Sequence, residues 1–206
     1  MIHKLALTIF LVLFPILCFG QSALLERGEN SIGLGGGLSF TRTISARQAN
    51  LVGSVAGILD IGYFSGKVSI NNTPIDASIY GFFGQVQLVR SNETPNKFPA
   101  NVAVFVQYSE SEARSSTTVG LRLFRRIRNK NSEVTLPGIT LARTVPNARN
   151  QDAVLSYYIE IPMAKRFGEN TMLSLFPSFG VADKQTFVSV ALGISLILGQ
   201  NPEQPK

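Results

Sequence analysis

The sequence has one histidine, one cysteine and no tryptophan among its 206 residues. His3 and Cys18 both lie in the first 20 residues, which have the features of a removable leader. The remaining chain, from Gln21 to Lys206, would contain neither residue type. This composition excludes disulfides, thiolate chemistry, zinc sites of the usual histidine and cysteine kind, and any catalytic triad that depends on histidine.

The leader, residues 1–20, is typical of a secretory signal peptide. Lys4 supplies the positive charge, a nearly continuous apolar stretch follows, and Cys18 and Gly20 are small residues at positions −3 and −1 of a cut before Gln21. The apolar stretch is short for a membrane-spanning helix and contains a proline. We therefore expect the chain to be exported, with acylation of the cysteine disfavoured by the residues that precede it.

Apolar residues alternate with small or polar residues from residue 30 onward, and no later segment has the pattern of an amphipathic helix. A two-residue period places the alternating residues on opposite faces of a β-strand. The last predicted strand shows this most clearly. Its apolar face consists of Val188, Val190, Leu192, Ile194, Leu196 and Leu198, and its other face of Ser189, Ala191, Gly193 and Ser195.

Turn-forming residues divide this pattern into nine clear strands and a weak tenth strand at Lys67–Asn71. The predicted turns include Ser45–Asn50 and a tight turn at Ser65–Gly66. Proline removes a hydrogen bond from a strand ladder, so we expect prolines inside strand-like runs to mark bulges or strand ends. Three prolines are of this kind: Pro137, Pro162 and Pro177.

Long, regular, alternating strands joined by short turns predict an all-β fold, an antiparallel up-and-down transmembrane β-barrel. Single-chain bacterial barrels have an even number of strands, so we predict ten strands, with eight as the alternative. An even number places both termini on the periplasmic side. The predicted organisation is a signal peptide at 1–20, a barrel domain at 21–199 and a polar tail at 200–206.

The strand faces opposite the apolar ones carry many glycines and a few polar or charged residues. Charged side chains are costly against lipid, so these residues are expected to face the lumen, where glycine makes room for larger neighbours. The predicted polar network in the lumen consists of Asp60, Gln85, Gln107, Arg122 and Glu160. Such a network suits either a path for ions or solutes or a filled, salt-bridged interior, and small barrels are generally filled.

Basic residues exceed acidic ones, and four of them cluster at one predicted hairpin: Arg125, Arg126, Arg128 and Lys130. We expect this cluster to be a solvated rim that faces anionic headgroups of outer-membrane lipids. In a barrel of ten strands this hairpin lies on the periplasmic side. Nucleic acid is disfavoured as a partner because the leader exports the chain and no recognition motif is present.

The sequence offers no clear catalytic constellation, cofactor motif or metal site. Glu110 and Glu112 lie in a loop without the regular spacing of a calcium site. The glycine-rich run at residues 33–37 does not precede a helix and is therefore not a phosphate loop. We expect a protein that is not an enzyme and holds no cofactor.

Three segments carry a resemblance to a known family: IGLGGGLSF at 32–40, LDIGYF at 59–64 and FVSVALGISLIL at 187–198. Together with the leader they resemble the small outer-membrane β-barrel proteins of Gram-negative bacteria. The resemblance implies a membrane-embedded, porin-like barrel with a structural, surface-binding or narrow-channel role, and no functional residue carries over from it. The alternatives are a periplasmic or secreted soluble β-sandwich or barrel that binds a partner and, less favoured, a barrel enzyme.

Overall fold

The computed structural model describes residues 21–70, 76–90, 100–111, 115–128, 133–147, 152–182 and 184–200. The predicted signal peptide and the tail beyond residue 200 lie outside these ranges. The strands are, in chain order, β1 (Glu29–Thr41), β2 (Ile44–Val55), β3 (Leu59–Ile70), β4 (Asp76–Val89), β5 (Asn101–Ser111), β6 (Ser115–Phe124), β7 (Ile127–Arg128), β8 (Glu133–Thr135), β9 (Gly138–Pro146), β10 (Val154–Glu160), β11 (Met163–Phe167), β12 (Thr171–Ala182) and β13 (Gln185–Gln200).

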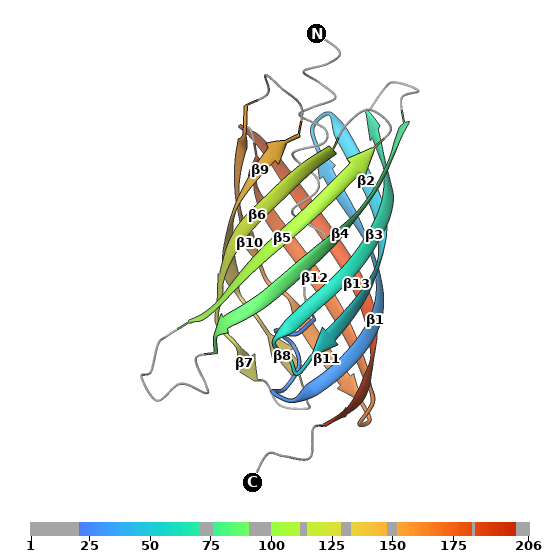
Figure 1. Cartoon of the computed structure of the whole chain (residues 1–206), viewed down its shortest axis with the longest axis vertical. Helices are drawn as coiled ribbons and strands as arrows, with labels where there is room; N and C mark the ends of the chain where they lie inside the picture. The colour runs from blue at the N-terminus through green and yellow to red at the C-terminus, as the bar shows by residue number, and fades with distance from the viewer. Residues whose placement is uncertain are drawn as a thin grey trace.

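These segments form one closed antiparallel barrel of ten strands (Figure 1), which confirms the predicted fold class and strand number. Three of the ten strands are interrupted, so that β6 continues as β7, β8 as β9, and β10 as β11. The first and last strands close the ring, with a register that runs from Thr41 opposite Phe187 to Glu29 opposite Gln200. A closed barrel also overturns the alternative of a two-sheet sandwich.

The two ends of the barrel differ in what they hold. Glu29 and Gln200 lie side by side at one end, at the bottom of Figure 1, which we call the terminal end. The opposite end, which we call the far end, contains the short turn between β1 and β2. Within the described ranges, no helix is both long enough and apolar enough to cross a membrane.

Two of the predicted turns are wrong. Ser45–Asn50 lies inside β2 and Ser65–Gly66 lies inside β3. The weak tenth strand predicted to begin at Lys67 is therefore the end of β3 and not a strand of its own. The turn between these strands is formed instead by Ala56 and Gly57, whose φ angles of 53° and 63° are both positive. The prediction failed because both faces of these strands are polar near the far end, so their residues resemble turn residues in the sequence: Arg47 and Ser65 face outward, whereas Gln48 and Asn50 face the lumen.

The exterior of the barrel is apolar along all ten strands. In β13 the outward side chains from Val188 to Leu198 are 39–65% exposed, whereas Ser189, Ala191 and Ser195 are at most 4% exposed. The predicted alternation of this strand is therefore confirmed. An apolar exterior of this extent is unfavourable in water and matches the hydrocarbon of a bilayer.

Glycine and aromatic residues are matched across neighbouring strands on the inner face. A Cβ atom on Gly62 would overlap the Phe83 ring, and one on Gly120 would overlap the Phe105 ring. Most inward aromatic side chains thus occupy the space above a glycine of the next strand, whereas Phe176 lies opposite Ala191. The directly opposed pairs are Phe64 with Gly81, Phe83 with Gly62, Phe105 with Gly120, Phe124 with Gly138, and both Tyr158 and Phe187 with Gly180.

Prolines follow a line of three interrupted strands and their uninterrupted neighbour β12. Pro137 lies between β8 and β9, Pro162 lies between β10 and β11, and Pro177 lies in β12 opposite that second break. Each proline carbonyl accepts a hydrogen bond from the interrupted neighbour, namely from the amides of Arg125, Leu136 and Ile161 at 2.8–3.1 Å. In an antiparallel ladder the N–H and C=O groups of one residue point to the same neighbouring strand. The N–H group that each proline lacks would therefore point to an interrupted part of that neighbour, where no regular ladder hydrogen bond is lost.

Gly120→Ala should lower the free energy of unfolding by about 1–3 kcal/mol, because the added methyl group overlaps Phe105 in a filled interior. The matched control is Gly84→Ala, since a Cβ atom there meets nothing closer than 3.8 Å. Urea unfolding of both variants, refolded in detergent micelles, measures the difference. Equal midpoints for the two variants would contradict the matched packing of glycine and aromatic residues.

Candidate functional site

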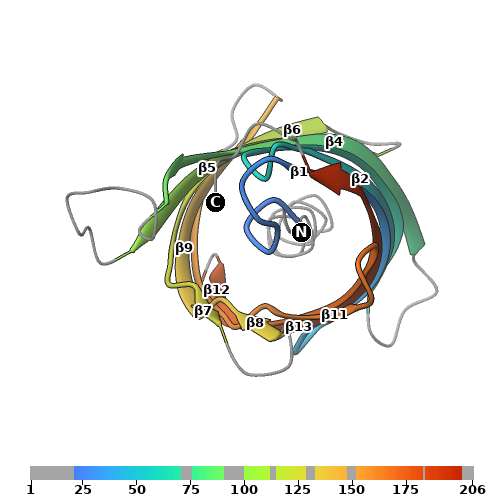
Figure 2. The ribbon, with the colours of Figure 1, turned by 90° about the horizontal axis from the view of Figure 1, so that it is seen from below.

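The segment before the first strand lies inside the barrel. Figure 2 shows this segment, residues 21–28, within the ring of strands, and we call it the plug segment. Its first five side chains, from Gln21 to Leu25, are at most 3% exposed. Two backbone hydrogen bonds, from Leu24 to the Gln21 carbonyl at 2.9 Å and from Leu25 to the Ser22 carbonyl at 3.2 Å, fold it into consecutive turns. The terminal-end part of the lumen is therefore occupied by the chain itself.

Asp60 on β3 holds the inner part of the plug segment. Its carboxylate accepts hydrogen bonds from the Ser22 amide at 2.8 Å and the Ser22 hydroxyl at 2.6 Å. Ser54 Oγ and Gln85 Nε2 donate to the same carboxylate at 2.5 and 3.2 Å. A fully buried carboxylate is tolerated only when several donors satisfy its oxygens, and here two of the donors come from the plug segment.

A chain of polar contacts continues from Asp60 across the lumen. Arg122 Nη1 donates to Gln85 Oε1 at 2.6 Å, and Arg122 Nε pairs with Glu160 Oε1 at 2.6 Å. Thr140 donates to the same glutamate oxygen at 3.0 Å. The guanidinium also lies 5.8 Å from the centre of the Phe105 ring. The structure therefore brings four of the five proposed lumenal residues into one hydrogen-bonded chain that begins at the plug segment.

Gln107, the fifth residue proposed for the lumenal network, lies inside the barrel but outside this chain. It is fully buried on β5, and neither of its side-chain polar atoms has a hydrogen-bond partner in the described part of the molecule. Ser39, Gln48 and Gln185, which lie near the far end, also have buried polar atoms without a partner among the described residues. These buried side chains make this part of the lumen polar and suited to hold water.

Arginine side chains hold the plug segment at the terminal end. Arg126 donates to the carbonyls of Leu25 at 2.8 Å and Leu24 at 3.2 Å, and it pairs with Glu26 at 2.8 Å. Arg90 donates to the Leu25 carbonyl at 2.9 Å. These donors satisfy carbonyls that would otherwise be unpaired inside the barrel.

The described residues of the predicted basic rim do not form one continuous surface, because their side chains point in different directions. Arg126 points into the lumen with a side chain only 7% exposed, because alternation after Arg122 and Phe124 turns it inward. Arg125 is exposed, Arg128 is 61% exposed and pairs with Glu26 of the plug segment, and Lys130 lies outside the described residues. The expectation of headgroup contact therefore does not hold for Arg126.

Sequence reasoning missed the contacts that join the plug segment and the first strand to the wall. Glu29, at the start of β1, is 1% exposed and forms a two-armed ion pair with Arg166 of β11, with one arm at 2.7 Å. Ser22, Arg90 and Arg166 gave no signal because their partners lie 38, 65 and 137 positions away. In the described ranges, no group of three or more histidine, cysteine, aspartate or glutamate side chains is placed to hold a metal ion.

The closed sheet, the apolar exterior and the polar, occupied interior together define an integral membrane β-barrel. Its surroundings are therefore membrane lipids.

No family model matches the sequence, and neither does any curated protein. Similar solved structures include the β domain of the Bordetella autotransporter BrkA, with 12% identity over 84% of this chain and 100% of that chain and a TM-score of 0.44. The outer membrane protein Omp33 of Acinetobacter baumannii shows 9% identity over 84% and 100%, with a TM-score of 0.38. Neisserial surface protein A shows 7% identity over 82% and 95%, with a TM-score of 0.35. Likeness at this level concerns the barrel fold alone.

Glu160→Ala should lower the free energy of unfolding by about 3–5 kcal/mol, because it leaves the Arg122 guanidinium buried without its partner. Replacing both residues, as Arg122→Met with Glu160→Leu, should restore much of the loss, since the buried charge is removed as well. Thermal and urea unfolding of the refolded barrel measure both variants. An unchanged unfolding transition for Glu160→Ala would show that the ion pair carries no stability.

Proposed function

We propose that the chain is exported to the outer membrane of a Gram-negative bacterium and acts there as a sealed, non-conducting structural barrel. The observation that carries this proposal is the plug segment, which is held by Asp60 on its inner side and by Arg90 and Arg126 at the terminal end. We expect a lumen occupied in this way to offer no continuous water path for ions. Export is supported by the leader pattern, and the outer membrane is the usual location of bacterial barrels.

The free energy of plug binding comes from both apolar burial and hydrogen bonds. Leu24 and Leu25 are fully buried, and complete burial of a leucine side chain contributes about 1.5–3 kcal/mol. Hydrogen bonds to charged groups such as Asp60 and Arg126 contribute about 1.5–3 kcal/mol each. The plug segment is therefore a stable part of the folded barrel, and this supports a sealed lumen over an open narrow channel.

The available side chains disfavour a catalytic role. Between residues 21 and 206 the sequence has no histidine or cysteine, so general bases and nucleophiles of the commonest kinds are missing. The buried carboxylates of Asp60 and Glu160 are engaged by serine, glutamine, arginine and threonine donors. We therefore propose that the protein is not an enzyme and needs no cofactor.

Ion conductance in planar lipid bilayers tests the sealed lumen. The wild-type barrel should give no steady conductance, whereas Asp60→Ala combined with Arg126→Ala should give current steps, because it removes the donors and acceptors that hold both sides of the plug segment. The control is Asp152→Ala with Lys184→Ala, which removes one acidic and one basic residue at exposed positions and should stay silent. Steady wild-type conductance equal to that of the plug variant would instead establish a narrow channel.

Insertion is checked on the same samples by heat-modifiable gel migration and by extraction. A folded barrel should migrate differently before and after boiling and should require detergent for extraction. A chain that is soluble without detergent would overturn the membrane location and favour a secreted barrel that binds a partner.

A further inference from the structure

Two cationic side chains face each other on the outer surface near the far end. Arg47 on β2 is directly opposite Lys67 on β3, and Lys67 is directly opposite Ser78 on β4. All three side chains are exposed on the outward face. Directly opposed residues of an antiparallel pair have Cβ atoms about 4.5–5.5 Å apart, so like charges at such positions destabilise the sheet.

No protein group in the described part of the molecule neutralises this pair. Neither Arg47 nor Lys67 makes an ion pair or a hydrogen bond there. The acidic residue on the same outward face of β4, Asp76, is opposite Ser69 and therefore only diagonal to Lys67. With one acidic and two basic residues, the outer surface of these three strands keeps a net positive charge.

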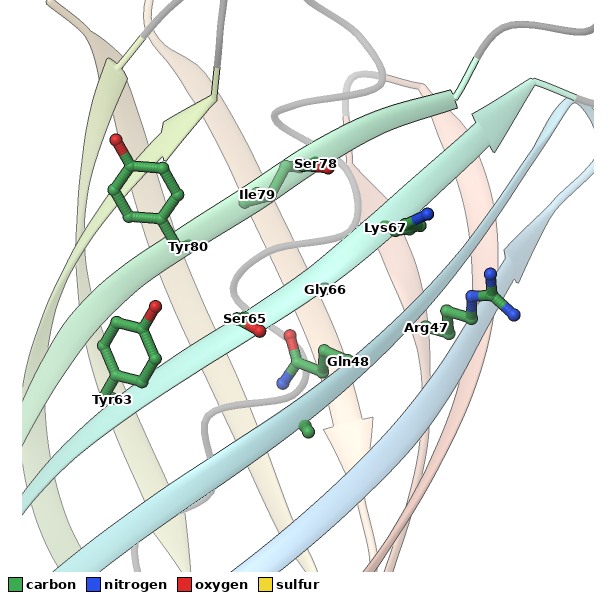
Figure 3. Close-up of a pocket in the computed structure, with 10 residues that line it drawn as sticks. Arg47, Gln48, Tyr63, Ser65, Gly66, Lys67, Ser78, Ile79 and Tyr80 are labelled. Atoms are coloured by element: carbon green, nitrogen blue, oxygen red, sulfur yellow. The ribbon is translucent and has the colours of Figure 1, made fainter.

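The cationic pair borders a hollow of about 490 Å³ on the outer wall. Figure 3 shows Tyr63 and Tyr80 along one side of this hollow, Arg47 and Lys67 farther along the strands, and Ser65 and Ser78 between them. The outward residues in the middle are small, which leaves the space unfilled. The hollow thus combines two cations, two hydroxyl donors and two aromatic side chains.

The outward residues of β3 and β4 change in a regular order toward the far end. Ile61 and Phe82 are about 60% exposed in the apolar region, Tyr63 and Tyr80 follow, and Lys67 and Ser78 come next, before Ser69 and Asp76. Tyrosine is enriched at the boundary between hydrocarbon and headgroups. Lys67 is four residues beyond Tyr63, or about 13 Å along the tilted strand, which places it outside the tyrosine level, on the headgroup side.

We propose that this hollow binds the phosphate-bearing headgroup of a membrane lipid in the leaflet at the far end. In this arrangement Arg47 donates two hydrogen bonds to the phosphate, Lys67 supplies a second positive charge, and the serine hydroxyls donate to the remaining oxygens. Tyr63 and Tyr80 contact the part of the lipid next to the chains. The bound anion also removes the repulsion between the two cations. The site rests on the proposed membrane insertion, but not on a sealed lumen.

Lipid selection is tested with the purified full barrel by native mass spectrometry after mixing with phosphatidylglycerol and phosphatidylcholine of equal chain length. Wild type should retain phosphatidylglycerol about tenfold more than phosphatidylcholine, and Arg47→Gln with Lys67→Gln should reduce this preference to near unity. Arg47→Lys should keep part of the preference. The matched control is Arg143→Gln with Lys184→Gln, which removes the same charge from other exposed positions and should leave the preference unchanged.

Thermal stability gives a second test, because the two cations should destabilise the barrel without lipid and stabilise it when an anionic lipid is bound. In a neutral detergent, Arg47→Gln with Lys67→Gln should raise the thermal midpoint because it removes a repulsive pair. Added phosphatidylglycerol should raise the wild-type midpoint and leave that of the double variant unchanged. A midpoint that responds equally in both proteins would overturn the site.

Two further outcomes would overturn the proposal. Inorganic phosphate that displaces the lipid at equal concentration would show a site for the free anion, and an equal loss of preference in the control variant would show a nonspecific charge effect. A double variant that still inserts, as judged by heat-modifiable migration, but loses lipid selection supports the site. If wild type itself does not insert, the proposed membrane location fails along with the site.

Discussion

Closure of the sheet by β1 and β13 is the constraint on which the rest of the structure depends. In hydrocarbon no water can satisfy unpaired backbone groups, and each such group costs several kcal/mol, so a membrane sheet must have no free edge. Closure with ten strands then fixes the two surfaces of the wall. Alternation sends large apolar side chains outward and small or polar ones inward, and the interior must be filled by what the chain supplies.

The interior is filled in two different ways. Aromatic rings occupy the space above glycines of neighbouring strands, while the plug segment fills the terminal end. Proline interruptions lie next to the plug segment, since Ala23 lines a small cavity together with Phe124, Leu136, Pro162 and Phe176. Arg126 follows one such break and reaches the plug carbonyls, so local irregularity of the wall and the seal of the lumen are part of one arrangement.

The outward side chains change along the barrel from the hydrocarbon region to the headgroup region. The strands continue past the apolar region, and the outward positions there become tyrosine and then cationic. Outward polar residues such as Arg47 and Ser65 contributed to the wrong turns at Ser45–Asn50 and Ser65–Gly66, because a strand that leaves the hydrocarbon no longer needs an apolar face. The same residues form the hollow that we assign to a lipid headgroup. The error in the strand boundaries and the lipid site therefore have one physical origin.

The sequence by itself determined the fold class, the even strand number and the inward position of Asp60, Gln85, Arg122 and Glu160, because the two-residue period is a local property of each strand. It could not place residues 21–28 in the lumen or set Arg47 opposite Lys67. Those features depend on register and closure, which join positions far apart in the chain. Ser22 meets Asp60 across 38 positions and Glu29 meets Arg166 across 137, and no local pattern encodes such pairs. Only the closed tertiary structure decided which side chains meet.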